Sequence, residues 1–220
     1  MNFIASSLEL KNHGQAVSAY GNTYLSSDCR ISNTDGDNEM RFRCLCFDKE
    51  GPRLSSFLSW SPGATALVTG HIVFSANVGE PLDLIITTLE TNVPKTFYCN
   101  QVVLGNAFFK DGEFKERRNG TLAAKIGTTL DNSDVTSWLF MEIGKARKTK
   151  LEDRIRKGRP ICVQGQLREY RKNGDESPYR AIVAQDFTTR RDRDSGAQTR
   201  ASTGSAAGYG EDDLDPTPEY

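Results

Sequence analysis

The chain repeats one order of predicted secondary-structure elements twice. In the first half, alternation of apolar and polar residues predicts strands over residues 16–31, 40–47, 66–74 and 82–89. In the second half, the same alternation predicts strands over residues 98–107, 120–129, 135–143, 160–170 and 179–187. Short helices are predicted at 52–60, with Leu54, Phe57 and Leu58 on one side, and at 145–156. We interpret each half as three strands, a helix and two strands, which is the order of a five-stranded Greek-key OB barrel.

The two halves also align directly. Val68-Thr-Gly-His-Ile72 aligns with Val163-Gln-Gly-Gln-Leu167, and in both halves a helix and a glycine-containing stop precede this segment. Asn92-Val-Pro94 interrupts the pattern between the halves. The sequence therefore predicts an all-β chain of two tandem OB folds, at 1–95 and 96–188, each with a short helix, followed by a tail at 189–220.

Charge is strongly segregated along the chain. Residues 96–190 contain 18 Lys and Arg against 12 Asp and Glu, a net charge of +6, whereas residues 1–95 carry −3 and residues 191–220 carry −4. A basic domain suits a polyanion, and an acidic tail suits a basic partner or that same domain. Residues 188–210 are mostly Arg, Asp, Ser, Ala, Thr and Gly, with almost no large apolar residue, so the tail is predicted to be disordered.

The composition argues against several other classes of protein. No stretch approaches the ~20 apolar residues of a membrane span, and the N-terminus resembles no signal peptide, so we expect a cytoplasmic protein. Five cysteines are an odd number for a disulfide framework. Cys44 and Cys46 share one face of a predicted strand, either as a metal or redox pair or, as we interpret them, as small core residues. His13 and His71 stand alone, so we expect no metal and no cofactor.

Four segments of the second half form a recognisable set. They are Asn100-Gln-Val-Val-Leu-Gly-Asn106, Asn119-Gly-Thr-Leu-Ala-Ala-Lys-Ile-Gly127, Thr136-Ser-Trp138 and the run from Lys157-Gly158 to Cys162-Val-Gln-Gly-Gln-Leu-Arg168. With the acidic, proline-containing C-terminus, they resemble the bacterial single-stranded DNA-binding protein family. The resemblance covers residues 98–187 and the tail and is weak over 1–95. The strand after Trp138 is one residue shorter than in the family, and the chain ends in Pro-Thr-Pro-Glu-Tyr220 where the family usually ends in Pro-Phe.

This resemblance implies sequence-independent binding and protection of single-stranded DNA in replication, recombination and repair. It also implies a nucleoid-associated protein that forms homo-oligomers, here a homodimer with four OB folds per assembly. The acidic tail would recruit replication and repair proteins. Its predicted partner-binding residues are Asp212, Asp213, Leu214, Asp215 and Tyr220.

Strand alternation sorts the residues of the second half without the resemblance. Leu139, Met141 and Ile143 share one face of their strand, which leaves Trp138 and Phe140 on the other. Aromatic rings interleaved with cations suit a single strand, because every base can stack and every nucleotide brings a phosphate. The predicted nucleic-acid-binding residues are Lys125, Trp138, Phe140, Lys145, Arg168, Tyr170, Arg171 and Lys172.

Several alternatives stay open. Trp138 and Phe140 would also suit core or subunit packing, and the basic run 145–150 would suit the solvent face of a helix. In the first half, Arg41 and Arg43 would contact phosphates or pair with nearby acids. No catalytic motif is present in the sequence, so an enzyme is not expected. The alternative functions are an accessory OB module of the replication or recombination machinery, with mainly protein contacts, and an RNA-binding OB protein.

Overall fold

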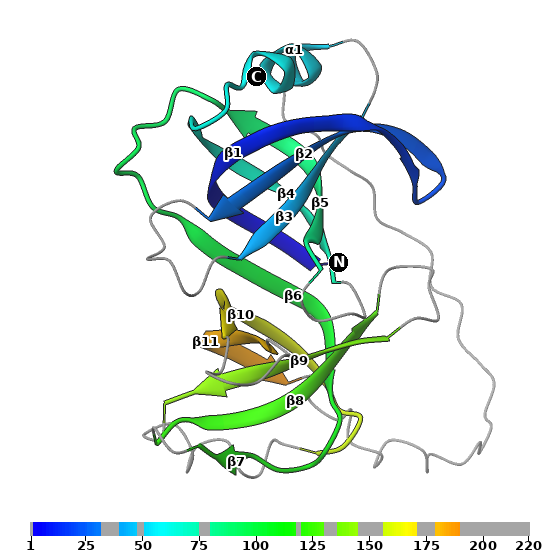
Figure 1. The fold of residues 1–220 in the computed structure, drawn as a ribbon. Coiled ribbons are helices and arrows are strands. Elements are labelled where there is room, and N and C mark those ends of the chain that lie inside the picture. Colours follow the sequence, from blue (N-terminus) through cyan, green and yellow to red (C-terminus); the bar gives the residue numbers. More distant parts are fainter. Residues whose placement is uncertain are drawn as a thin grey trace, which may run out of the picture. The chain divides into compact units, whose positions relative to one another are not determined.

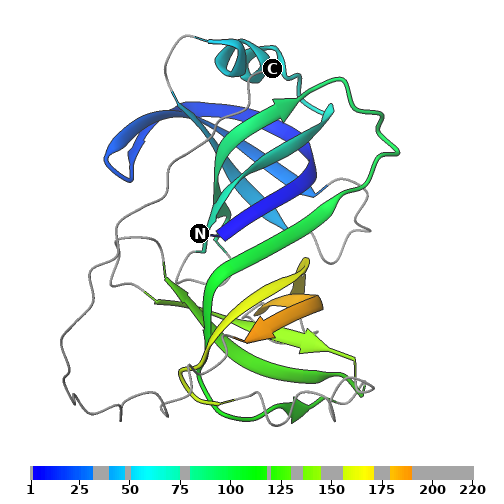
Figure 2. The same cartoon turned by 180° about the vertical axis from the view of Figure 1, so that it is seen from behind.

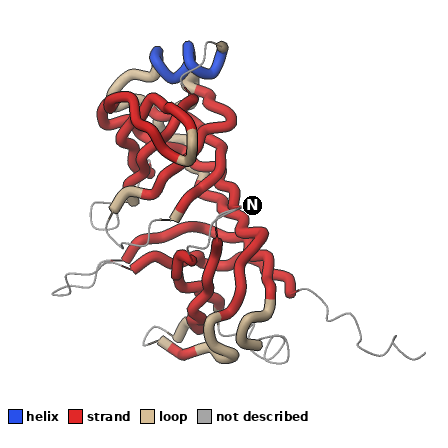
Figure 3. The backbone as a smooth tube through the Cα atoms, turned by 90° about the vertical axis from the view of Figure 1, so that its right-hand side faces the viewer, coloured by secondary structure: helices blue, strands red, loops and turns tan. Residues whose placement is uncertain are grey.

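The computed structural model describes most of the chain up to Thr189. The described residues are 2–31, 40–47, 51–74, 80–117, 120–129, 136–144, 156–170 and 179–189. Residues Met1–Arg190 form one compact unit, whereas Arg191–Tyr220, nearly all of the tail predicted at 189–220, lie outside the described residues. Strands dominate the described part of the chain (Figure 3). Within it, no helix is long and apolar enough to cross a membrane.

The first five strands form a closed barrel (Figure 1). Its elements are β1 (Asn2–Ala19), β2 (Asn22–Ile31), β3 (Arg41–Phe47), α1 (Pro52–Ser59), β4 (Thr65–Val73) and β5 (Leu82–Glu90). The strand order is β2-β3-β5-β4-β1, and pairing between β1 and β2 closes the sheet. Only the β3–β5 pair is parallel among these pairings. The first half is therefore an OB fold, as predicted.

The second half repeats this topology. Its strands are β6 (Asn100–Phe109), β7 (Lys115–Glu116), β8 (Leu122–Thr129), β9 (Thr136–Ile143), β10 (Pro160–Tyr170) and β11 (Tyr179–Thr189). The order β6-β10-β11-β9-β8 closes through β6–β8, and the β9–β11 pair is parallel. The two-residue β7 is an addition to the predicted pattern. The helix predicted at 145–156 falls almost wholly outside the described residues.

One shared irregularity explains the alignment of the two halves. β4 shifts register against β5 just before Gly70, and β10 shifts register against β11 just before Gly165. A Cβ on Gly70 would lie 2.2 Å from the carbonyl oxygen of Ile85, and a Cβ on Gly165 would lie 2.2 Å from that of Val183. Glycine is thus the residue that lets two backbones approach at each bulge. The Val-x-Gly-x-Ile/Leu pattern therefore marks a β-bulge at the equivalent position of each barrel.

The sequence pattern missed most of β1. The strand predicted over 16–31 is in fact the end of β1 and all of β2, joined by a hairpin at Tyr20 and Gly21. Both residues have positive φ, 51° and 74°, as a two-residue type I′ turn requires. Earlier in β1, Ser6 and Ser7 are fully buried because both hydroxyls donate to the Cys99 carbonyl oxygen. Buried serines conceal the apolar alternation that would have indicated a strand.

Antiparallel pairing of β1 with β6 joins the two barrels. Asn2 is opposite Leu104 and Ser6 is opposite Asn100, so the strands form one eleven-stranded sheet. Figure 2 shows β6 running between β1 and β10. Outside this ladder, Ser137 Oγ donates to the Phe74 carbonyl oxygen at 2.7 Å. The domain boundary expected near residues 91–95 stays a prediction, because Met1–Arg190 form one unit.

Helix α1 covers part of the first core. It begins at Pro52, whose fixed φ suits a first helical turn. Phe57 is 1% exposed and Leu54 packs against the core. Leu58, which the pattern placed beside them, is 60% exposed, so that part of the prediction is wrong. An eight-residue helix on a small barrel buries a narrower stripe than the sequence indicated.

Candidate nucleic-acid interface

The outer face of β9 carries the aromatic residues that strand alternation assigned to solvent. Trp138 is 40% exposed and Phe140 is half-buried. Leu139, Met141 and Ile143 are at most 3% exposed and belong to the core. The predicted orientation of this strand is therefore confirmed, and core packing is not the role of Trp138 within this barrel.

Trp138 belongs to a row of residues that crosses β6, β8 and β9. Phe108 is opposite Gly127, which is opposite Trp138. The two rings meet edge to face with centroids 5.7 Å apart. A Cβ on Gly127 would lie 2.7 Å from Cζ of Phe108 and 2.9 Å from Cζ3 of Trp138. Because Gly127 has no side chain, both rings can lie against the sheet at this position.

Two ammonium groups flank the exposed ring. Lys110 Nζ lies 5.3 Å from the Trp138 ring centroid, and Lys125 Nζ lies 5.9 Å from it. The amide of Lys110 donates to the carbonyl oxygen of Lys125 at 2.9 Å, which holds the two backbones together. An exposed aromatic ring with two cations close to it offers a stacking surface for a base near a site for its phosphate. We call Phe108, Lys110, Lys125 and Trp138 the Trp138 cluster.

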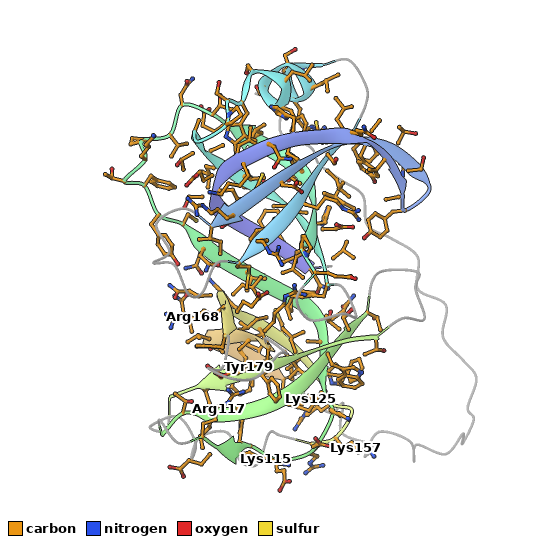
Figure 4. All side chains as sticks on the ribbon, viewed as in Figure 1. Lys115, Arg117, Lys125, Lys157, Arg168 and Tyr179 are labelled. Carbon is orange, nitrogen blue, oxygen red and sulfur yellow. The ribbon has the colours of Figure 1, made fainter. Side chains whose placement is uncertain are left out.

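A second aromatic cluster adjoins it and contains Arg117, Phe140, Glu142, Tyr170 and Tyr179. Tyr170 and Tyr179 are stacked, with centroids 5.0 Å apart and planes 26° apart. Phe140 meets Tyr179 edge to face at 5.7 Å. The guanidinium carbon of Arg117 lies 4.9 Å from the Phe140 centroid and 4.5 Å from that of Tyr179. We call these five residues the Arg117 cluster, of which Figure 4 labels Arg117 and Tyr179.

Glu142 is the polar centre of the Arg117 cluster. It is 4% exposed, and it pairs with Arg117 at 3.0 Å and accepts a hydrogen bond from the Tyr170 hydroxyl at 3.1 Å. Burial, with the negative charge of Glu142 nearby, raises the pKa of Tyr170 above its ordinary value. The phenol therefore remains a neutral donor at physiological pH, and the carboxylate holds both neighbours in place.

The remaining predicted residues divide into two groups. Arg168 is exposed on β10, where its guanidinium donates to Gln166 Oε1 at 3.3 Å (Figure 4). Tyr170 lies on the same strand, inside the Arg117 cluster. The predicted residues that lie outside the described part of the chain are Lys145, Arg171, Lys172, Asp212, Asp213, Leu214, Asp215 and Tyr220.

Sequence reasoning missed Phe108, Lys110, Arg117 and Tyr179. Tyr179 opens a predicted strand and is opposite Tyr170 in the hairpin, so the pairing register would have found it. Phe108 and Lys110 lie beyond the predicted end of their strand at residue 107. Arg117 precedes β8, and only the turn at that position brings it over the rings. No periodic signal marks such a residue.

The equivalent face of the first barrel is built differently. Arg43 is opposite Asp83 in the parallel β3–β5 pair, which corresponds to Phe140 opposite Ala181 in β9–β11. By the same register, Arg41 corresponds to Trp138. Arg43 donates to both Asp83 carboxylate oxygens, at 2.7 and 2.6 Å. Of the two alternatives for Arg43, pairing with an acid is the one observed.

Tyr20 completes this ion pair. Its hydroxyl, at the tip of the β1–β2 hairpin, donates to Asp83 Oδ2 at 2.7 Å. Burial and the Asp83 carboxylate raise the pKa of Tyr20 well above its ordinary value. Where the second barrel presents aromatic rings, the first barrel thus presents a bidentate ion pair with a phenol bound to it.

Cys44 and Cys46 lie in the core, as we interpreted them from the sequence. Cys44 and Cys46 are at most 1% exposed in the first core, and all five cysteines are free thiols. Across the described residues, no group of three or more His, Cys, Asp or Glu side chains is arranged to hold a metal ion.

The topology defines a chain with two tandem OB folds, and the site is an aromatic and basic face on the second. The crystal structure of wild-type single-stranded DNA binding protein from Thermus aquaticus matches with a TM-score of 0.57 at 15% sequence identity, over 94% of this chain and 97% of that chain. A deletion variant of the same protein matches with a TM-score of 0.56 at 14% identity, over 87% of this chain and 95% of that chain. No protein-family model and no curated protein matches the sequence. The predicted resemblance is confirmed at the level of the fold and extends through the first barrel.

Proposed function

We propose that the chain binds single-stranded DNA without sequence preference and protects it during replication, recombination and repair. The observation that carries this proposal is the exposed Trp138 ring, flanked by Lys110 and Lys125 on the outer face of an OB barrel. A ring that is 40% exposed is available to a base, and two nearby cations suit the phosphates of any sequence. The fold shared with the Thermus aquaticus protein supports the same conclusion.

Binding is assigned to the second barrel. Its face has open aromatic surface and cations, whereas the first barrel has Arg43 bound by Asp83 at the equivalent position. Arg30 of the first barrel likewise pairs with Glu9 at 3.0 Å. A cation that is already paired gains less from a phosphate, because the existing partner must be displaced. The first barrel therefore contributes mainly structure and protein contacts.

Charge makes a separate, testable contribution. We expect Lys125→Gln or Arg168→Gln to reduce the slope of log K against log salt concentration by up to about one unit for each phosphate that the substituted side chain no longer neutralises. The matched control is Lys11→Gln, which removes a first-barrel cation that pairs with Glu9 and should leave the slope unchanged. Poly(dT) titrations of each variant at several salt concentrations measure this slope. An affinity that does not depend on salt would contradict the electrostatic part of the proposal.

The acidic C-terminal tip, residues 211–220, is proposed to recruit partner proteins. Its carboxylates would bind Lys and Arg of a partner, while Leu214 or Tyr220 fills a small apolar pocket. Deleting residues 211–220 should leave poly(dT) affinity equal or slightly higher, because the tip competes with DNA for the basic face. The deletion should also abolish pull-down of replication and repair proteins. Partner binding that survives the deletion would place recruitment on the barrels instead.

For the assembly, we propose the homodimer with four OB folds that the resemblance implies. The same stacking chemistry serves RNA, so poly(rU) belongs in every titration beside poly(dT). Equal affinity for both polymers would favour a general single-strand binder over one dedicated to DNA.

A further inference from the structure

The proposed function is argued from the Trp138 cluster and does not use Arg117, the cation of the neighbouring Arg117 cluster. We propose that the Arg117 cluster is a second base-binding subsite, in which the guanidinium of Arg117, and not an aromatic ring, is the surface on which the base stacks. This inference rests on the proposed function and assigns a residue and a geometry to it.

Arg117 covers the rings that would otherwise receive the base. Its guanidinium carbon lies 4.9 Å from the Phe140 centroid and 4.5 Å from that of Tyr179. A base that approaches these rings therefore meets the guanidinium first. The Arg117 side chain is 23% exposed, so part of it faces solvent. Arginine planes stack against unpaired bases as aromatic rings do, so the covered rings serve as its support.

Arg117 is held in this position from both ends. Its amide donates to the Thr121 carbonyl oxygen at 2.8 Å and its carbonyl accepts from the Gly120 amide at 2.9 Å. At the other end, Glu142 binds its guanidinium at 3.0 Å. Because Glu142 is nearly buried and also accepts from Tyr170, it is a fixed anchor. A side chain ordered before binding loses little entropy when the ligand arrives.

The spacing of the two clusters implies separate bases. Trp138 and Phe140 are two residues apart on one face of β9, which is about 7 Å along the strand. Stacked bases in a duplex strand are only about 3.4 Å apart. Bases on Trp138 and on Arg117 are therefore splayed apart and each is stacked on protein. An extended single strand can satisfy this geometry and a duplex cannot.

The ion pair also separates this subsite from a phosphate contact. Glu142 balances the charge of Arg117, so the pair should add little to the salt dependence of binding. Lysine at position 117 keeps the charge and its pairing with Glu142 but has no planar group to stack. We therefore expect Arg117→Lys to weaken binding of dT oligonucleotides about 5- to 30-fold and to leave the salt slope unchanged.

The test uses the full chain and the fluorescence of Trp138, since Trp60 is 1% exposed and out of reach of DNA. dT oligonucleotides of increasing length are titrated into the wild type, Arg117→Lys and the control Arg30→Lys. Arg30 is an arginine of the first barrel that pairs with Glu9 at 3.0 Å, and a lysine there keeps the charge but has no planar group. The control should bind like the wild type. Arg117→Lys should lose affinity but keep the full quenching of Trp138 at saturation, with an unchanged melting temperature.

Two results would overturn this subsite. Wild-type affinity of Arg117→Lys would show that the guanidinium plane does not stack on a base. Tighter binding would show that Arg117 covers Phe140 and Tyr179 as a lid that the DNA must displace. Both results would leave the proposed function intact, because quenching of Trp138 in the wild type by single strands tests that function separately.

Discussion

Arg180→Met is expected to lower the free energy of unfolding by about 3–5 kcal/mol, the cost of removing one partner from a buried ion pair. Arg180 Nε donates to Glu169 Oε2 at 3.1 Å, and the two side chains are 5% and 4% exposed. Burial lowers the pKa of the Arg180 guanidinium even with Glu169 beside it, so this charge is held at a cost. Methionine would leave the buried carboxylate without that guanidinium. Urea unfolding measures the loss.

This ion pair also supports the binding face. Glu169 is opposite Arg180 in the β10–β11 ladder, and the next pair along is Tyr170 opposite Tyr179. Arg180 also donates to the Glu80 carbonyl oxygen of the first barrel. We therefore expect the substitution to loosen the stacked tyrosines as well as the barrel.

A matched control separates the effect of burial on the free energy of unfolding from the effect of breaking an ion pair alone. Arg30→Met removes the cross-strand pair with Glu9, whose side chains are 34% and 24% exposed. An exposed pair of this kind contributes only about 0–1 kcal/mol. Combining Arg180→Met with Glu169→Gln should recover part of the loss, because the buried charge is then gone. Equal, small effects of Arg180→Met and Arg30→Met would contradict this account of the second barrel.

Trp138→Ala is expected to weaken poly(dT) binding by about 1–3 kcal/mol, or about 5- to 150-fold in Kd. The ring is the exposed member of its cluster, so a base that stacks on it loses its main surface. Stability should change little, because the inward face of β9 is intact. Filter binding or anisotropy with labelled dT oligonucleotides measures the affinity, since the substitution removes the fluorescent reporter.

The other tryptophan provides the control for this substitution. Trp60 is 1% exposed and its Nε1 donates to the Ala64 carbonyl oxygen at 3.1 Å. Trp60→Phe should therefore lower the melting temperature and leave the affinity for DNA unchanged. If instead Trp138→Ala leaves affinity unchanged while stability falls sharply, Trp138 is a packing residue and the assigned face is wrong.

The fold was predictable where apolar and polar residues alternate along a strand, and where two backbones approach so closely that only glycine fits. Gly70 and Gly165 appear at the same place in both halves, and each allows the bulge that brings two backbones together. β1 was not predictable from alternation, because the buried Ser6 and Ser7 depend on the distant Cys99 backbone. A polar residue that a remote segment satisfies looks like a surface residue in the sequence.

The candidate site was predictable for residues within strands. Trp138 and Phe140 follow directly from the period of β9, and Lys125 follows from that of β8. Arg117 could not be found in this way, since its position depends on the turn before β8 and on a carboxylate from β9. The sequence also did not predict that the first barrel has an ion pair where the second has aromatic rings. The Arg43–Asp83 pair depends on the parallel register of β3 and β5, which only the fold sets.

Fluorescence titration of the full chain with poly(dT) and with duplex DNA of equal length tests the central claim most directly. Trp60 is buried and Trp138 is exposed, so a change in emission on binding reports on Trp138. We predict saturable quenching by poly(dT) that weakens as salt is added, with little response to the duplex, whose bases are already stacked. Equal quenching by both polymers, or none by either, would contradict the assignment of the second barrel as a surface that binds single strands.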